Sequence, residues 1–158
     1  MKIVSLSAEL AVLRALTSKD PRMVGEIIAT TDSSYFHSVE SVEIYETVRK
    51  LFLTSGEPPS YRLVIQDPEL SEDARQHFRD SQALVKTIED SRRAVKILNK
   101  YRQTRGLYNL AGLIAERLKG RKINLEGVLD EVATHFVQIR ARKTSSENYL
   151  HIGVNNNS

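Results

Sequence analysis

Histidines have the most versatile side-chain chemistry in this sequence, because an imidazole can hold a metal ion or transfer a proton near neutral pH. The chain has four of them: His37, His77, His135 and His151. No two are three or four residues apart, the spacing that would direct two imidazoles from one helix face to a single metal ion. The absence of cysteine also excludes thiolate ligands and cysteine nucleophiles. We therefore predict no metal site.

Phosphate binding and covalent catalysis find no better support. A phosphate-binding loop needs a run of glycines that ends in Gly-Lys-Ser/Thr between a strand and a helix. The nearest segment, Gly120-Arg121-Lys122, lacks the preceding glycine and the following hydroxyl, and it is predicted to be a turn between helices. Asp130 and Glu131 fall on the polar side of an amphipathic helix, and no serine occupies a strand-to-helix elbow. We predict no catalytic residue and no cofactor site in this chain.

Positive charge is concentrated in one part of the chain. Residues 86–122 hold 11 Lys/Arg against 3 Asp/Glu, whereas residues 1–85 hold 9 against 13 and residues 123–158 hold 3 against 4. Such a positive field suits an acidic surface or a phosphate backbone. The alternative is a solvated face that pairs in part with the acidic N-terminal residues, because aromatic residues are not interleaved as in a stacking platform for single strands.

One long apolar stripe, from Thr87 to Leu118, predicts the helix around which the chain is organised. Its members recur at steps of three and four residues: Ala94, Ile97, Tyr101, Thr104, Leu107, Ala111, Ile114 and Leu118. At 1.5 Å per residue this helix would be roughly 45 Å long, which exceeds the width of a small domain. One end must therefore project from the domain or contact a partner.

A second stripe follows after a short connection, and it starts behind Asn124, a suitable N-cap. Its members are Leu125, Val128, Leu129, Val132, Phe136 and Ile139. The short connection predicts that the two helices form an antiparallel hairpin. Gly106 and Gly112 oppose a continuous first helix, since each costs about 1 kcal/mol relative to alanine. Gly106 marks either a bend or a break, and Gly112 lies in a small-residue patch that another helix can approach.

Shorter helices are predicted in residues 1–85. Ser7 is expected to cap the first, which ends near Ser18, and Asp20-Pro21 to start the second. A third spans Val39 to Ser55 and stops at Gly56. Tyr61 to Ile65 is predicted as helix over strand, and Ser71 begins a helix that carries its apolar residues inward, namely Ala74, Phe78 and Leu84.

The resulting fold prediction is all-α, because strand-like alternation is absent. Residues 1–85 form a compact head of four or five short helices, residues 86–143 a long antiparallel helical hairpin, and residues 144–158 a polar linker. A composition of 41% hydrophobic and 27% charged residues is that of a soluble globular protein. No apolar run approaches the roughly 20 residues that cross a bilayer, and no signal peptide is evident. We expect a cytoplasmic protein without membrane contact.

Eight segments, in this order along the chain, carry a resemblance to a known family. They are Ser7 to Leu13, Val24-Gly25-Glu26-Ile27-Ile28, Tyr35-Phe36-His37, Ile44 to Leu51, Gly56-Glu57-Pro58, Tyr101-Arg102-Gln103-Thr104-Arg105-Gly106-Leu107-Tyr108, Ile114 to Leu118 and Leu129-Asp130-Glu131. Together, over about residues 7 to 142, they resemble the N-terminal domain of DnaB-like replicative DNA helicases, the phage versions above all.

The resemblance implies a ring. In that family the N-terminal domains form a collar in which hairpins pair between subunits to give a trimer of dimers, and the collar receives primase and in some cases a helicase loader. A linker leads to a RecA-like motor that uses ATP and Mg²⁺ to pull single-stranded DNA. The motor's phosphate-binding motif is missing here, which suggests that residues 144–158 lead toward an absent domain in a bacterial or phage-infected cell.

Pairing between hairpins would bury a defined set of residues, although the core of the chain itself is the alternative for each. The predicted subunit-interface residues are Tyr101, Leu107, Tyr108, Ile114, Val128, Val132 and Phe136. The basic tip is a candidate contact for nucleic acid or a partner protein through Arg117, Lys119, Arg121 and Lys122. Two other functions stay open: the helicase-binding domain of a primase, which has a related head and hairpin, and a small helical DNA-binding regulator.

Overall fold

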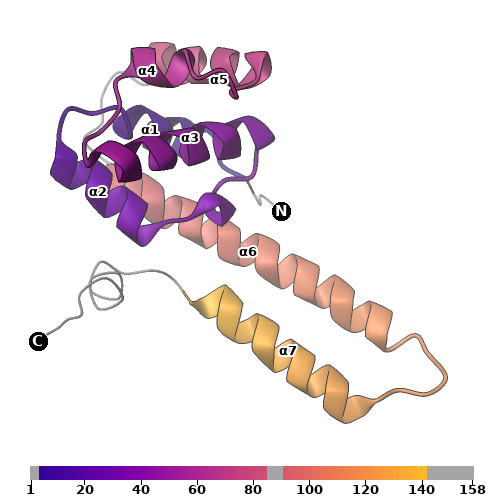
Figure 1. Ribbon diagram of the computed structural model, residues 1–158. Helices are drawn as coiled ribbons and strands as arrows, with labels where there is room; N and C mark the ends of the chain where they lie inside the picture. The colour runs from indigo at the N-terminus through magenta and orange to yellow at the C-terminus, as the bar shows by residue number, and fades with distance from the viewer. Residues whose placement is uncertain (1–3, 85–90, 142–158) are drawn as a thin grey trace, which may run out of the picture.

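The computed structural model describes residues 4–84 and 91–141, and all regular structure in these ranges is helical. Seven α-helices and one short 3-10 helix follow one another without a strand in this described part of the chain. Figure 1 shows a head of short helices from which one long helix runs out and a second returns beside it. The all-α prediction, with a head and a hairpin, is confirmed. None of the described helices is long and apolar enough to cross a membrane.

The first two helices of the head begin at side-chain caps. Helix α1 spans Leu6–Ala15 and is capped by Ser5, whose Oγ accepts a hydrogen bond from the Ala8 amide at 3.3 Å. The predicted cap, Ser7, is wrong because Ser5 caps equally well and lies one half-turn earlier, and the helix also ends before Ser18. Helix α2, Pro21–Thr30, begins as predicted at Asp20, whose carboxylate accepts from two backbone amides.

The remaining helices of the head follow the sequence signals closely. The 3-10 helix η1 spans Ser33–Tyr35, and α3 spans Val39–Ser55 as predicted. Gly56 ends α3 in the left-handed conformation, with φ of 77°, which a residue with a side chain rarely adopts. Helices α4, Tyr61–Ile65, and α5, Glu72–Leu84, complete the head.

The core of the head lies between α1, α3, α5 and the first part of the long helix. Tyr45 at its centre packs against Phe36, with ring centroids 5.0 Å apart, and its hydroxyl donates to the Thr31 carbonyl at 3.0 Å. Burial raises the pKa of Tyr45 to about 12. Phe78 on α5 is fully buried and stacks on Tyr61. Leu84, predicted to point inward, is instead 69% exposed.

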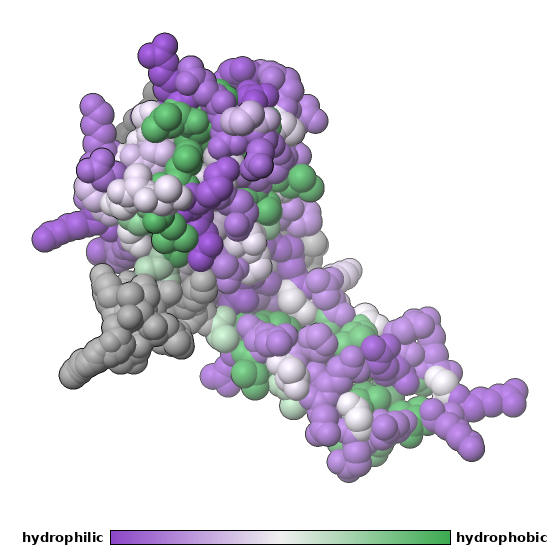
Figure 2. Space-filling model, viewed as in Figure 1, coloured by the Kyte–Doolittle hydropathy of each residue, from purple (hydrophilic) through white to green (hydrophobic). Residues whose placement is uncertain are grey.

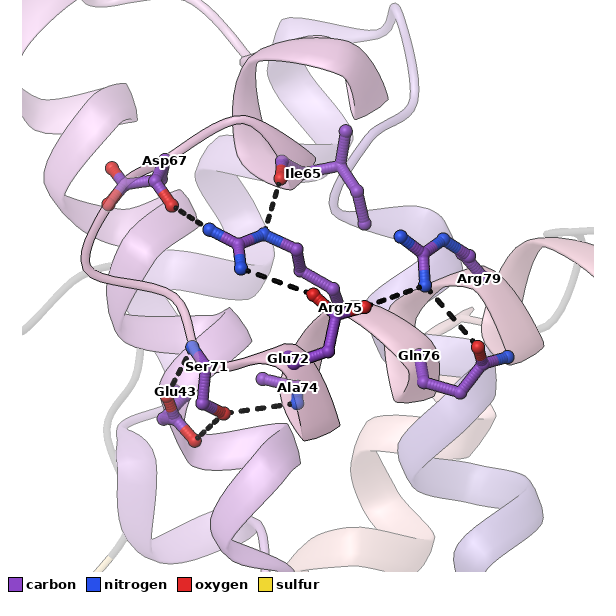
Figure 3. A network of polar contacts seen from close by, with 9 residues as sticks. All are labelled: Glu43, Ile65, Asp67, Ser71, Glu72, Ala74, Arg75, Gln76 and Arg79. Atoms are coloured by element: carbon purple, nitrogen blue, oxygen red, sulfur yellow. Dashed lines mark hydrogen bonds and ion pairs between the residues drawn. The ribbon is translucent and has the colours of Figure 1, made fainter.

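A polar network fixes the connection between α4 and α5 to α3 (Figure 3). Arg75 donates to the main-chain carbonyls of Ile65 and Asp67 at 2.9 and 2.8 Å, so that its guanidinium holds the turn in place. The carboxylate of Glu43 accepts from both the amide and the hydroxyl of Ser71 at 3.1 and 2.9 Å. The head is therefore closed by satisfied polar contacts as well as by its core.

The long helix α6, Ser91–Arg117, belongs to the head at one end and to the hairpin at the other. Ala94 and Leu98 are part of the head core, so the expected division at residue 85 does not coincide with a break in packing. The expected start at Thr87 and the linker 144–158 lie outside the described residues. Helix α7, Leu125–Arg140, starts at its predicted cap, where the Asn124 side chain accepts from the Gly127 amide at 3.1 Å.

Candidate assembly surface on the helical hairpin

The two arms of the hairpin are held together at the tip by an ion pair. The guanidinium of Arg117 on α6 donates to both carboxylate oxygens of Glu131 on α7, at 2.9 and 3.1 Å. This contact lowers the pKa of Glu131 and raises that of Arg117, because each charge stabilises the other. A paired Arg117 is less available to an outside phosphate than the sequence alone suggested.

Arg102, which sequence reasoning had not predicted as a contact between the arms, holds the base of the hairpin together. Its Nη2 donates to the main-chain carbonyls of Ile139 and Ala141 at 3.2 and 2.7 Å, at the C-terminal end of α7. Its guanidinium also lies over the ring of Tyr35 in the head, 5.2 Å from the centroid. Arg102 thus ties the end of α7 to both α6 and the head.

Helix α6 continues through Gly106, so the predicted alternative of a break at this glycine is wrong. A Cβ at this position would lie 2.8 Å from Cγ1 of Ile139, so the glycine lets α7 approach α6 closely. Gly112, six residues further on, has nothing within 4 Å of a Cβ built on it. It lies with Ala111 and Ala115 in an exposed patch of small residues on the outer half of α6.

Helix α7 is amphipathic, yet none of its sixteen residues is buried. Apolar side chains on both arms are widely exposed, including Leu107 at 49%, Leu129 at 53% and Phe136 at 46%. Figure 2 shows apolar residues along the hairpin among hydrophilic ones. Because a monomeric soluble protein rarely exposes a large apolar surface, the hairpin is the candidate contact site of this chain.

The exposed apolar residues of the two arms lie on the same side of the hairpin. On α6, Leu107 and Leu118 lie about a quarter turn from the side that faces α7. On α7, Leu125 and Leu129 lie about a quarter turn from the side that faces α6, in the same rotational sense. Because the two helices are antiparallel, a rotation in the same sense about each helix axis places both apolar stripes on the same side of the hairpin. We call this surface the hairpin face, and it consists of Leu107, Ala111, Ile114, Leu118, Leu125, Leu129 and Phe136.

The structure places the predicted interface residues in three settings. Leu107 and Phe136 are exposed on the hairpin face, and Tyr108 is exposed on another side of α6. The others are half-buried, either at the contact between the arms or near the head: Tyr101, Ile114, Val128 and Val132. Sequence reasoning had put Leu118, Leu125 and Leu129 on buried stripes rather than at the interface, although they are exposed.

The basic tip is only partly free. Arg117 is paired with Glu131, and Lys119 contacts Glu116 at 3.3 Å. Arg121 and Lys122 lie exposed in the turn, and neither has an ion pair within the described residues. Within residues 4–84 and 91–141, no group of three acidic, histidine or cysteine side chains is placed to hold a metal ion.

No protein-family model and no curated protein matches the sequence. The crystal structure of the N-terminal domain of DnaB helicase from Mycobacterium tuberculosis is similar, with a TM-score of 0.73 and 13% sequence identity, over 87% of this chain and 99% of that one. This chain has the DnaB N-terminal domain fold. At such low identity the likeness to the DnaB domain establishes the fold alone.

Proposed function

We propose that this chain is the N-terminal collar domain of a ring-forming replicative DNA helicase and that its hairpin face binds the hairpin face of a second copy. The observation that carries the proposal is α7, a helix of sixteen residues with none buried, whose exposed apolar stripe adjoins that of α6. A helix of this length is marginal in water unless its apolar side is covered. Covering it with an identical hairpin supplies the missing packing.

The shape and charge of the hairpin face favour a second copy as the occupant. Its residues are apolar or small, and a two-fold axis would set the stripe of one hairpin against the same stripe of the other. Likeness to a domain of DnaB helicase supports assembly of this kind.

The wider helicase function is also part of the proposal. Dimers of this kind would build a hexameric collar that receives primase and in some cases a loader, in the cytoplasm of a bacterium or a phage-infected cell. Nucleotide hydrolysis with ATP and Mg²⁺, and movement on single-stranded DNA, would belong to a motor domain outside residues 1–158. The exposed Arg121 and Lys122 at the tip would add a positive field near that DNA.

Sedimentation velocity over a concentration series tests the pairing. We expect the chain to sediment as a dimer or larger species, and Leu129→Glu to shift it to the monomer because a buried charge without a partner is costly. Leu63→Glu is the matched control, since Leu63 on α4 is 58% exposed in the head. A wild-type chain that stays monomeric at the highest soluble concentration contradicts the proposal, as does equal loss of the dimer in both variants.

A further inference from the structure

A groove on the head has no part in the proposed collar function. It has a volume of about 500 Å³ and lies between the α1–α2 connection, the α3–α4 connection and α5. Its lining includes Arg14, Lys19, Glu57, Pro59, Tyr61 and Gln82. Figure 1 shows α4 and α5 on the side of the head away from the hairpin, so a ligand here would not compete with pairing of hairpin faces.

Arg14 is the unusual residue of this groove. It lies in the last turn of α1 and is half-buried, and its Nε atom is buried with no hydrogen-bond partner among the described residues. Arg75 on α5 is the instructive contrast, because its side chain is also largely covered and its guanidinium donates to two main-chain carbonyls and to Glu72. The fold therefore satisfies one arginine of the head and leaves the other with an unused buried donor.

Nε is the only nitrogen of this guanidinium that is buried, and the terminal nitrogens also have no acceptor among the described residues. The groove therefore favours a ligand that brings an acceptor to these terminal nitrogens. A carboxylate matches best, since its two oxygens accept side by side from the planar guanidinium fork. Lys19 lies in the same lining and adds a second positive charge. Glu57 also lines the groove and limits the net charge that it presents.

The composition of the lining favours a peptide over a nucleic acid as the source of the carboxylate or other anion. A phosphate backbone is bound by rows of cations, and this groove offers only Arg14 and Lys19 against Glu57. An extended peptide gains instead from the rigid wall of Pro58 and Pro59. Hydroxyl and amide groups for its main chain are at hand in Ser18, Ser60, Tyr61 and Gln82.

We propose that this groove binds an extended acidic segment of a partner protein, with a carboxylate of the segment on the guanidinium of Arg14. The partner is defined by this chemistry: a Glu or Asp side chain, or a terminal carboxylate, in a segment with few bulky residues. The site lies on the head and uses none of the residues of the hairpin face. The proposed binding therefore does not depend on whether the chain forms a collar.

Nitrogen-15 NMR of the full chain tests the proposal, because the Arg14 Nε–H signal responds to what the guanidinium binds. The probes are an acetylated, amidated hexapeptide of alternating glycine and glutamate, and the same peptide with glutamine. We expect the glutamate peptide to shift the Arg14 Nε–H signal and amides around the groove, and the glutamine peptide to leave both unchanged. Arg14→Gln should weaken binding about tenfold or more, and Arg22→Gln, an exposed arginine outside the groove, should not.

Four results would overturn the proposal: no shift in the groove with the glutamate peptide, equal shifts with the glutamine peptide, equal weakening by both substitutions, or equal binding of a thymidine oligonucleotide. The comparison of the two peptides needs only the wild-type chain, so it decides even if Arg14→Gln does not fold. A melting experiment adds an independent readout. Arg14→Met should melt at or above the wild-type temperature because it removes an unsatisfied donor, whereas Arg75→Met should melt below it.

Discussion

The head and the hairpin use the same kind of amphipathic helix to different ends. In the head, apolar stripes from α1, α3 and α5 converge on one core, and side chains such as Phe78 and Tyr45 are fully buried. In the hairpin, α7 meets chiefly α6 and buries none of its residues. A periodic apolar stripe in a sequence therefore predicts a helix reliably, but it does not predict whether other residues of the same chain bury that stripe.

The polar contacts of the two regions differ in the same way. In the head, the network around Arg75 satisfies donors and acceptors at a connection that the fold needs (Figure 3). In the hairpin, Arg102 and the pair of Arg117 with Glu131 fix the ends of α7, and apolar packing along its length is thin. The head, with the first part of α6, has a buried core, whereas the hairpin leaves much of its apolar surface exposed.

Truncating one aromatic residue in each region should give the largest difference in the free energy of unfolding between the head and the hairpin. Phe78→Ala should destabilise the head by about 3–5 kcal/mol, since it opens a cavity in the core. Phe136→Ala should cost less than about 1 kcal/mol at a concentration where the chain is monomeric, because that ring is already half-exposed. Urea unfolding followed by circular dichroism measures both. Similar losses for the two variants would show that the hairpin is packed as tightly as the head.

Alkaline pH should destabilise the head through Tyr45. Its pKa is raised to about 12 in the folded chain, so its contribution is intact below the ordinary tyrosine pKa of about 10. That contribution, roughly 2–3 kcal/mol, should be lost as the pH rises through the folded value.

The measurement for Tyr45 is the difference in the free energy of unfolding between wild type and Tyr45→Phe, because lysines also titrate in this range. When this free energy is measured by urea unfolding from pH 9 upward, the values for the two proteins should converge as the pH rises. Parallel curves would show that Tyr45 ionises as easily in the fold as in the unfolded chain.

Adding one methyl group to each of two glycines in α6 should give changes of opposite sign. Gly106→Ala should destabilise the chain by about 1 kcal/mol, because the clash with Ile139 outweighs the gain in helix propensity. Gly112→Ala should stabilise the isolated chain by about 0.5–1 kcal/mol, since its Cβ meets nothing. Thermal unfolding at low concentration measures both, and a gain in both variants would contradict the close approach of α7 at Gly106.

Acid should have the smallest effect and should act at the hairpin tip. The lowered pKa of Glu131 means that the pair with Arg117 is intact above the ordinary carboxylate pKa and is lost as the pH falls through the folded value. The Arg117 Nε–H signal in an NMR titration reports this loss. Glu126→Gln serves as the control for Glu131→Gln, and a signal that moves equally in both variants would argue against the pair.

Much of the fold was predictable from the sequence because its helix boundaries have local causes. Asp20-Pro21, Asn124 and Gly56 each start or stop a helix through their own side-chain or backbone chemistry, and each was assigned correctly. Ser5 and Ser7 are chemically equivalent caps, so sequence could not choose between them. Leu84 was misplaced because burial at the end of a helix depends on neighbours that periodicity does not specify.

The candidate sites were less predictable, because they depend on contacts between segments far apart in the chain. Arg102 binds carbonyls nearly forty residues away, and the role of Gly106 depends on Ile139. Leu129 is exposed because no other helix among the described residues covers its side of α7. The unused donor of Arg14 is invisible in a sequence for the same reason.

Pairing of hairpin faces is tested most directly by NMR on a sample that mixes isotope-labelled and unlabelled copies of the chain. Isotope-filtered spectra then record contacts between copies only. The proposal predicts intermolecular contacts from Leu129 and Phe136 to Leu107 and Leu118, and none from Leu63 in the head. A sample of the concentrated chain that gives no intermolecular contacts on the hairpin, or gives them only on the head, would contradict it.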